Sequence, residues 1–303
     1  MLSRISSKDK RILERLYMSG CEVRLFENMS CRTSISIGGP VKAFVLPHTL
    51  TSLMEAYRVL ESEGEIFKVM GHGTNLLVSD SYLDIYVLST GYVSGLEIHG
   101  DVLVAEGGAS LKGVIERAME EGLGGMEELY GIPGSVGGAV FMNAGAYGKE
   151  IKDVLLWAEI FDGKGVVRLS AEDLGLSYRR SNIKDEVVLR AAFKLERKDG
   201  DEVLKRMRYF LRRRLEKQPV FERSAGSIFK RPRQDFYVGS TLEKLGFKGY
   251  RVGKVKISEK HAGFMVNEGG GTFEEAMRLV DVIKGKVKDE YGIELEMEVV
   301  VWK

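Results

Sequence analysis

The chain has 303 residues, 44% of them hydrophobic and 29% charged, which is typical of a protein that folds around apolar cores in water. Its formal net charge of +1 excludes binding to nucleic acid or to an anionic membrane through overall charge. No apolar run approaches the length of a membrane-spanning helix, and the N-terminus has no continuous apolar segment like that of a signal peptide, so we expect a cytoplasmic protein.

The cysteines and histidines show no pattern of a metal site. Cys21 and Cys31 form no Cys-x-x-Cys pair, and the sequence leaves open whether they are joined. The four histidines, which are scattered without the spacing of ligands, are His48, His72, His99 and His261. We therefore expect no bound metal and a reducing cellular compartment.

The first third of the chain alternates helical and extended patterns. Residues 8–19 predict an amphipathic helix, because Ile12 and Leu16 fall on one stripe of its surface. Thr51 or Ser52 is expected to cap a second helix. The elements predicted after the first helix are a strand at 41–47, the second helix at 51–64, and strands at 65–71, 83–90, 93–100 and 101–108. This order predicts a β-α-β arrangement followed by strands joined through short turns.

Turn residues separate the elements in the middle of the chain. A helix predicted at 110–125 ends in a glycine stop, and residues 153–170 predict a hairpin that turns at 162–165. A strand at 187–197 precedes a helix at 199–219, where we expect a domain boundary. The residues that share the apolar face of this helix are Leu204, Met207, Leu211 and Leu215.

The C-terminal part predicts a second, smaller α+β unit. Its expected elements are a loop at 218–239, strands at about 252–257 and 262–266, a helix at 272–290 and a final strand at 293–302. In the final strand Glu294, Glu296 and Glu298 alternate with apolar residues, so the three carboxylates share one face. The arginine run at 212–214 predicts a solvated helix face, because its side chains project over a wide arc.

Two glycine-rich segments, residues 71–80 and 131–148, stand out from the rest of the chain. The first has Leu76 where a Rossmann fingerprint needs its third glycine, and neither segment ends in the Gly-Lys-Ser/Thr of a P-loop. Glycines allow a backbone to curl around a diphosphate, although they also serve tight turns and close strand packing. A nucleotide cofactor is favoured by the polar side chains that accompany them, which are Thr74, Asn75, Ser135 and Asn143.

Six motifs occur in a fixed order along the chain, namely "GHGTNLLVSD", "GIPGSVGGAVFMNAGAYG", "SYRRSNIK", "SAGSIFKRP", "GFKGYRVGKVKISEKHAGFMVN" and "IELEMEVVVW". From about residue 28 to the C-terminus the chain thereby resembles the UDP-N-acetylenolpyruvoylglucosamine reductases, the MurB family of peptidoglycan synthesis. The spacing between "SAGSIFK" and "SEKHAGF" is similar to the family's shorter type, which lacks an extra loop over the substrate.

The resemblance implies an α+β fold with an FAD-binding domain of the vanillyl-alcohol oxidase and p-cresol methylhydroxylase type and a smaller C-terminal α+β substrate domain. The implied bounds are 1–29 for an N-terminal helical segment, 30–198 for the FAD-binding domain with two α+β subdomains, and 199–303 for the substrate domain. The residues implied to bind noncovalent FAD are Gly71, His72, Gly73, Thr74, Asn75, Leu76, Gly131, Ile132, Pro133, Gly134, Ser135, Gly138, Asn143, Gly145 and Ala146.

The reaction implied by the resemblance is the reduction of UDP-N-acetylglucosamine enolpyruvate to UDP-N-acetylmuramate, with NADPH as reductant and a hydride delivered from flavin N5. Arg179 aligns with the family's arginine and suits a substrate carboxylate. Neighbours in an extended segment point in opposite directions, so only one of Arg179 and Arg180 can face the pocket, and the resemblance to the family's Tyr-Arg-x-Ser pattern selects Arg179. Ser227 aligns with the family's proton donor and Glu296 with its catalytic carboxylate.

Further substrate contacts are implied only weakly. The residues concerned are Tyr178, Lys230, Arg231, Lys248 and His261. Position 231 departs from the family pattern, because some members have an asparagine there; an arginine could bind a diphosphate directly.

Two other interpretations remain open at this point. One is another flavin oxidoreductase with the same cofactor domain, although no residue typical of a covalent flavin link is evident. The other is a non-catalytic nucleotide-binding regulator, which the joint presence of Arg179, Ser227 and Glu296 disfavours. We expect a monomer, and the sequence does not decide between NADPH and NADH.

Overall fold

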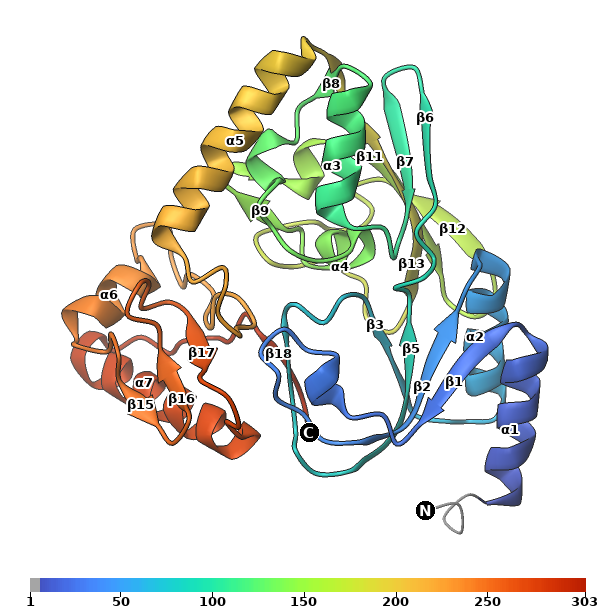
Figure 1. Cartoon of the computed structure of the whole chain (residues 1–303), viewed down its shortest axis with the longest axis horizontal. Helices are drawn as coiled ribbons and strands as arrows, with labels where there is room; N and C mark the ends of the chain where they lie inside the picture. The colour runs from blue at the N-terminus through green and yellow to red at the C-terminus, as the bar shows by residue number, and fades with distance from the viewer. Residues whose placement is uncertain (1–5) are drawn as a thin grey trace. The chain divides into compact units, whose positions relative to one another are not determined.

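The computed structural model of the chain (Figure 1) describes residues 6–303, which form two compact units. Unit 1 comprises Met1–Glu27, Val41–His72 and Asp84–Leu211. The segments of unit 2 are Asn28–Pro40, Gly73–Leu83 and Arg212–Lys303. The bounds expected from the sequence follow chain order, whereas the two units exchange segments along the chain.

A four-stranded sheet in unit 1 has the order β1-β2-β5-β3. Strands β1 and β2 are antiparallel, and β3 and β5 are parallel. Figure 1 shows the two N-terminal helices beside this sheet. The bounds are α1 Ser7–Met18, β1 Cys21–Leu25, β2 Val41–Pro47, α2 Leu50–Ser62, β3 Phe67–Met70 and β5 Leu83–Ser89. The predicted elements in this region are therefore present with small shifts at their ends.

A side chain caps the N-terminus of each of the two helices. Ser6 caps α1, and its hydroxyl accepts from the backbone of Asp9. The cap of α2 is Thr49, whose hydroxyl accepts from the backbone N–H of Ser52 at 3.1 Å. The prediction of Thr51 or Ser52 as the cap is wrong, because Ser52 occupies the third helical position of the capping box.

The second sheet of unit 1 has five strands in the order β12-β11-β13-β7-β6. The predicted hairpins are confirmed: β6 pairs antiparallel with β7, and β11 with β12. Asp162 shapes the second turn, since its carboxylate accepts from Lys164 N at 2.9 Å and Gly165 N at 3.0 Å. The strand bounds are β6 Leu96–His99, β7 Val102–Glu106, β11 Leu155–Phe161, β12 Val166–Leu169 and β13 Val187–Lys194.

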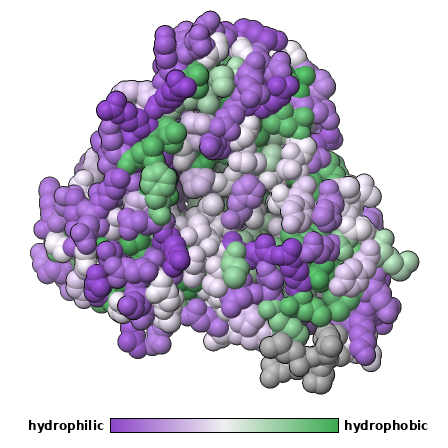
Figure 2. Space-filling view, in the orientation of Figure 1, coloured by the Kyte–Doolittle hydropathy of each residue, from purple (hydrophilic) through white to green (hydrophobic). Residues whose placement is uncertain are grey.

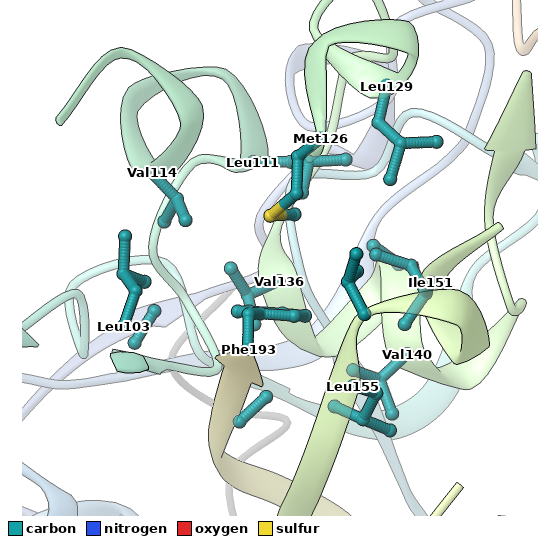
Figure 3. Packing of buried hydrophobic residues seen from close by; sticks show 14 of the residues in the cluster. Leu103, Leu111, Val114, Met126, Leu129, Val136, Val140, Ile151, Leu155 and Phe193 are labelled. Carbon is teal, nitrogen blue, oxygen red and sulfur yellow. The ribbon is translucent and has the colours of Figure 1, made fainter. Parts of the chain in front are cut away.

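Helices of unit 1 pack on this sheet around a large apolar core (Figure 3). The labelled side chains in Figure 3 include Val136 and Val140 from α4 and Phe193 from β13, all fully buried. Val203 and Met207 attach α5 to the same core, so the apolar face of this helix is centred on them. The helices are α3 Leu111–Glu120, α4 Val136–Phe141 and α5 Gly200–Lys217. Burial of α4 fixes the second glycine-rich segment to the sheet.

Short elements connect the main layers of unit 1. Two-residue strands form two small pairs, β9 with β10 and β8 with β14. Their bounds and those of the 3₁₀ turns are β8 Leu123–Gly124, η3 Glu127–Leu129, β9 Gly145–Ala146, β10 Lys149–Glu150, η4 Ile151–Asp153 and β14 Glu196–Arg197.

Unit 2 combines a three-stranded antiparallel sheet, β15-β16-β17, with helices and a parallel pair, β4 and β18. Ile35 and Ile37 from the segment 28–40 and Leu77 from the segment 73–83 belong to its core. They pack there with residues of the C-terminal helices. The bounds are η2 Met29–Cys31, β4 Leu76–Val78, α6 Val238–Lys244, β15 Arg251–Val252, β16 Val255–Ile257, β17 Met265–Asn267, α7 Phe273–Tyr291 and β18 Val300–Trp302.

Two strand predictions in unit 2 are wrong in detail. The strand expected at 252–257 is a hairpin, because Gly253 turns the chain with φ +59°. The strand expected at 293–302 forms a ladder only over β18, although burial still alternates along it, with Leu295 and Val299 buried and Glu294 and Glu296 exposed. Glu298 and Met297 are both half-buried, so the expected separation of carboxylates from apolar side chains is present at Glu294 and Glu296 but not at Glu298.

Hydrophilic residues cover most of the face seen in Figure 2, and hydrophobic residues appear there in small separate groups. Arg212 is exposed and pairs with Glu216, whereas Arg213 and Arg214 are half-buried, so the solvated face expected at 212–214 is present only in part. Both cysteines are free, Cys21 buried and Cys31 exposed. Among residues 6–303, no helix is long and apolar enough to cross a membrane.

Candidate active site

Three glycine-containing segments meet in unit 1. Residues 107–111 pair with residues 134–137 through backbone hydrogen bonds from Leu111 N to Gly134 O at 3.0 Å, Val136 N to Ala109 O at 2.8 Å and Gly137 N to Gly107 O at 2.7 Å. Gly71 approaches the same place, since a Cβ there would overlap the hydroxyl of Ser135. The structure therefore brings the end of β3 and the second glycine segment together.

The segment at 106–110 is a part of this site that the glycine motifs did not indicate. Gly107 and Gly108 directly follow β7, and a Cβ at Gly108 would overlap the carbonyl oxygen of Thr90. His72 contacts this segment through Nε2, 3.0 Å from Gly108 O. A glycine pair at the end of a strand was the available signal for such close backbone approach.

The glycines of the second segment serve different purposes. Gly134 needs its φ of +131°, and a Cβ at Gly137 would lie 3.0 Å from Gly107 O, so the protein's own backbone requires both. Gly138 is exposed, and a Cβ there would meet only the Ser135 hydroxyl, at 3.3 Å. Protein packing does not demand a glycine at 138, whereas close approach of a ligand would.

Ser135 and Asn143 use their side chains within the protein. The Ser135 hydroxyl caps α4 by accepting from Gly138 N at 3.2 Å. Asn143 is fully buried; its amide nitrogen donates to Glu150 Oε2 at 3.1 Å and Ser177 O at 2.9 Å, and its oxygen accepts from Lys152 N at 3.0 Å. These side chains hold the segment in shape, and their expected contacts with a cofactor stay predictions.

Arg179 lies in a tight turn of unit 1. Ser177 and Arg180 exchange backbone hydrogen bonds at 3.0 and 3.1 Å, so the expectation of an extended segment is wrong. Arg179 has φ +53°, a conformation that a bulky residue rarely adopts. Its guanidinium donates to Gly145 O at 2.9 Å and lies 5.2 Å from the centre of the Tyr178 ring. The structure thus places Arg179 against the second glycine segment.

Residues 73–76 of the first glycine segment belong to unit 2. Gly73 O accepts from Ser34 N at 3.1 Å, and Leu76 begins β4. The Asn75 amide donates to Glu298 O at 3.0 Å, and Asn75 O accepts from Val300 N at 3.0 Å. Asn75 therefore holds the backbone just after Glu296.

Ser227 and Glu296 lie on neighbouring segments of unit 2. Backbone hydrogen bonds join Lys230 N to Glu296 O at 2.9 Å and Glu298 N to Ile228 O at 2.8 Å. The ammonium group of Lys230 lies 2.6 Å from Glu296 Oε1. Ser227 is half-buried and forms a bridge with Phe264, and among the described residues its hydroxyl has no hydrogen-bond partner. The hydroxyl is thus available to a ligand.

The weaker substrate candidates in unit 2 have varied surroundings. Arg231 lies over the ring of Tyr237, 4.5 Å from its centre, and Lys248 pairs with Glu243 at 2.5 Å. Burial lowers the pKa of His261, and its Nδ1 accepts from Gly263 N at 3.0 Å. His261 is therefore neutral near pH 7 and supplies no positive charge to a diphosphate.

The residues of unit 1 fit the diphosphate of a dinucleotide. In the part of the chain that the structure describes, the backbone N–H groups of Gly134 and Ser135 donate to no protein acceptor. Together with the open position at Gly138, they offer donors and close access to an anion without an intervening side chain. Within residues 6–303, no group of three or more His, Cys, Asp or Glu side chains could hold a metal ion.

Comparison with known proteins identifies the class to which this fold and site belong. A family model described as "FAD binding domain" matches residues 41–170, and the model of the C-terminal domain of UDP-N-acetylenolpyruvoylglucosamine reductase matches residues 218–302. The protein is a flavoprotein with an FAD-binding domain of the vanillyl-alcohol oxidase and p-cresol methylhydroxylase type, so the predicted fold class and FAD are confirmed.

Individual relatives define the family. The reductases of Thermotoga sp. (strain RQ2) and Thermotoga maritima are 49% and 48% identical to this chain, covering 96% and 92% of it and 97% and 98% of their own lengths. The crystal structure of the Thermus caldophilus reductase superposes with a TM-score of 0.79 at 30% identity, covering 93% of this chain and 99% of that one. The chain belongs to the UDP-N-acetylenolpyruvoylglucosamine reductase family, as its motifs indicated.

Proposed function

We propose that this enzyme reduces UDP-N-acetylglucosamine enolpyruvate to UDP-N-acetylmuramate, with NADPH as reductant, in the synthesis of peptidoglycan precursors. The observation that carries the proposal is the presence, in one chain, of the matched FAD-binding domain and the matched reductase C-terminal domain. FAD held there would supply the chemistry of hydride transfer between NADPH and the enol.

Gly134, Ser135 and Gly138 would hold the FAD diphosphate. Two backbone N–H donors and an open glycine surface support this assignment, because an anion is bound by such donors when no side chain intervenes. His72 and Gly71 shape this diphosphate site indirectly. His72 contacts Gly108 O, and Gly71 lies close to Ser135.

Arg179 binds the substrate carboxylate in this proposal. Negative charge moves into that carboxylate when a hydride reaches the enol, and a guanidinium offers two parallel donors to it. The strained backbone of Arg179 supports a functional role, because such conformations persist where the surrounding structure holds them.

Ser227 gives its proton to the carbon next to the carboxylate, and Glu296 acts as the catalytic carboxylate. Within residues 6–303 the half-buried hydroxyl of Ser227 has no hydrogen-bond partner, and this supports the first role. The contact of Lys230 with Glu296 supports the second, because it places an ammonium donor beside the carboxylate. The expected cytoplasmic location and monomeric state stay predictions.

The test of this assignment is the Ser227→Ala variant, which removes a hydroxyl and little volume. FAD should remain bound, and NADPH should bleach it at the wild-type rate, because that half-reaction needs no proton at the enol. Reoxidation by the enolpyruvyl substrate in stopped flow should slow by roughly a hundredfold, the usual loss when a general acid is removed.

A matched control is Ser240→Ala, which removes an exposed hydroxyl from α6 of the same unit and should leave both half-reactions unchanged. Wild-type reoxidation of the Ser227→Ala flavin by substrate would refute the role of Ser227. Slowing confined to the NADPH half-reaction would refute it equally.

A further inference from the structure

The last residue of α4 and the segment that follows this helix hold the turn that carries Arg179 at both of its ends. At the first end, Ser177 O accepts from the amide of Asn143 at 2.9 Å. At the other end, the hydroxyl of Ser181 donates to Phe141 O at 2.7 Å. The guanidinium itself donates to Gly145 O at 2.9 Å. Three hydrogen bonds therefore join this turn to residues 141–145, all within unit 1.

The position and conformation of Asn143 suit it to holding the turn that carries Arg179. It is fully buried and has φ +41°, and asparagine tolerates the left-handed conformation better than other side chains of its size. It also donates to Glu150 Oε2, across from Gly145 in the small β9–β10 pair. One amide thereby links β10, which pairs with the strand that supplies the acceptor for Arg179, with the turn that supplies Arg179.

We propose that Asn143 and Ser181 are positioning residues for Arg179, which hold its guanidinium in the orientation that receives the substrate carboxylate. This inference rests on the proposed role of Arg179. It departs from the expectation that Asn143 contacts the cofactor, because the polar atoms of its side chain are used within the protein.

The left-handed backbone of Arg179 explains why positioning is needed. The left-handed conformation is unfavourable for a residue with a Cβ. Such a residue lowers its free energy by relaxing to a right-handed turn unless its surroundings prevent it. Hydrogen bonds at Ser177 and Ser181 oppose this relaxation from both sides. Loss of either contact would leave Arg179 in the chain but spread its guanidinium over several orientations, and small misplacements of a binding group reduce rates strongly.

The test uses two variants, one for each end of the turn. Asn143→Gly deletes the amide while keeping the left-handed backbone accessible, and Ser181→Ala deletes one hydroxyl. Each should slow flavin reoxidation by the enolpyruvyl substrate at least about tenfold per bound flavin, and Ser181→Ala should do so with the NADPH half-reaction and flavin content unchanged. Ser170→Ala is the matched control, because its hydroxyl contacts Asp173 in the same part of the chain without touching the turn; it should retain the wild-type rate.

A double-mutant cycle with Arg179→Lys separates this inference from the proposed function. If Asn143 and Ser181 act through Arg179, then Asn143→Gly and Ser181→Ala should slow reoxidation much less in the Arg179→Lys background than in the wild type. Equal slowing in both backgrounds, or wild-type rates in both single variants, would overturn the inference while leaving the role of Arg179 intact. A wild-type rate for Arg179→Lys alone would refute the proposed role of Arg179 instead. Should Asn143→Gly fail to fold, Ser181→Ala carries the same comparison.

Discussion

Backbone strain marks the Arg179 region more clearly than any side-chain pattern does. In the described residues, five positions other than glycine have positive φ, and three of them, Asn143, Tyr147 and Arg179, lie in this one region of unit 1. Tyr147 is held by its ring contact with Phe210, 5.0 Å between centres. Such clustering is common at functional sites, and it depends on tertiary contacts that hold each residue in place.

A substitution at Gly71 tests whether the contact between the two glycine-rich segments shapes the FAD site. In Gly71→Ala the new methyl group would force the Ser135 hydroxyl to rotate, which breaks its hydrogen bond with Gly138 N. Because a hydroxyl can rotate cheaply, we expect the fold to survive and FAD to bind more weakly. The measurement is the flavin absorbance per purified chain.

Gly165→Ala is the control for this prediction. A Cβ at Gly165 meets nothing within 4 Å, and its φ is not positive. The control should keep the wild-type flavin content. Full retention of FAD in Gly71→Ala after extensive dialysis would show that the contact between Gly71 and Ser135 does not shape the cofactor site.

At the scale of elements, α1 is anchored to the sheet by a charge cluster as well as by Ile12 and Leu16. Asp9 lies 2.7 Å from Lys42 Nζ on β2, and Tyr86 OH donates to it at 3.3 Å. Burial alone would raise the pKa of Asp9, but hydrogen bonds from Lys42 and Ser6 lower it to about 2 from its ordinary 3.8. The ionised carboxylate is therefore part of the folded state.

Asp9→Asn should lower the free energy of unfolding by about 2 kcal/mol at pH 7, since Lys42 loses its nearest carboxylate and keeps the longer contact with Glu65, at 3.2 Å. Because the folded pKa is depressed, the carboxylate's contribution is complete above about pH 4 and is lost as pH falls toward 2. The difference between wild type and variant should consequently shrink between pH 5 and pH 3 in urea denaturation.

The control for Asp9→Asn is Glu14→Gln, on the exposed side of the same helix, which should change stability by less than about 0.5 kcal/mol at either pH. A difference between wild type and Asp9→Asn that stayed constant from pH 5 to pH 3 would contradict the assignment of the stabilising group to the ionised Asp9.

Most elements could be predicted because their patterns are local. The helix at 8–19 and the hairpin at 153–170 follow from periodicity and turn residues that act over a few positions. The turn at Ser177–Arg180 could not be predicted, because its left-handed residue is an arginine rather than a glycine and is held by contacts from residues 141–145. The same holds for 293–299, whose alternation is clear although only β18 pairs in a continuous ladder.

At the scale of the whole molecule, the exchange of segments between the units limited what sequence order could predict. Residues 28–40 and 73–83 join the C-terminal unit, where β4 pairs with β18 from the other end of the chain. Such long-range pairing leaves no local signal, since each partner alone is a short apolar run. For the same reason α5 contributes Val203 and Met207 to the core of unit 1, although the boundary was expected at 199.

Most residues of the candidate site could be predicted from the sequence, but their contacts could not. The motifs located Arg179, Ser227 and Glu296 through resemblance, whereas the contacts of Lys230 with Glu296 and of Asn143 with Ser177 required the structure. The segment at Gly107 and Gly108 was missed because two glycines after a strand are common in turns. Its importance follows from backbone contacts with residues 134–137.

The most direct test of the proposed function is an anaerobic visible spectrum of the purified enzyme through one catalytic cycle. We predict that the protein carries noncovalent FAD, that NADPH bleaches the flavin absorbance, and that UDP-N-acetylglucosamine enolpyruvate restores it with formation of an equal amount of UDP-N-acetylmuramate. If the bleached flavin is reoxidised by oxygen but not by the enolpyruvyl substrate, the protein is a flavin oxidoreductase with another acceptor, and the proposed function is wrong.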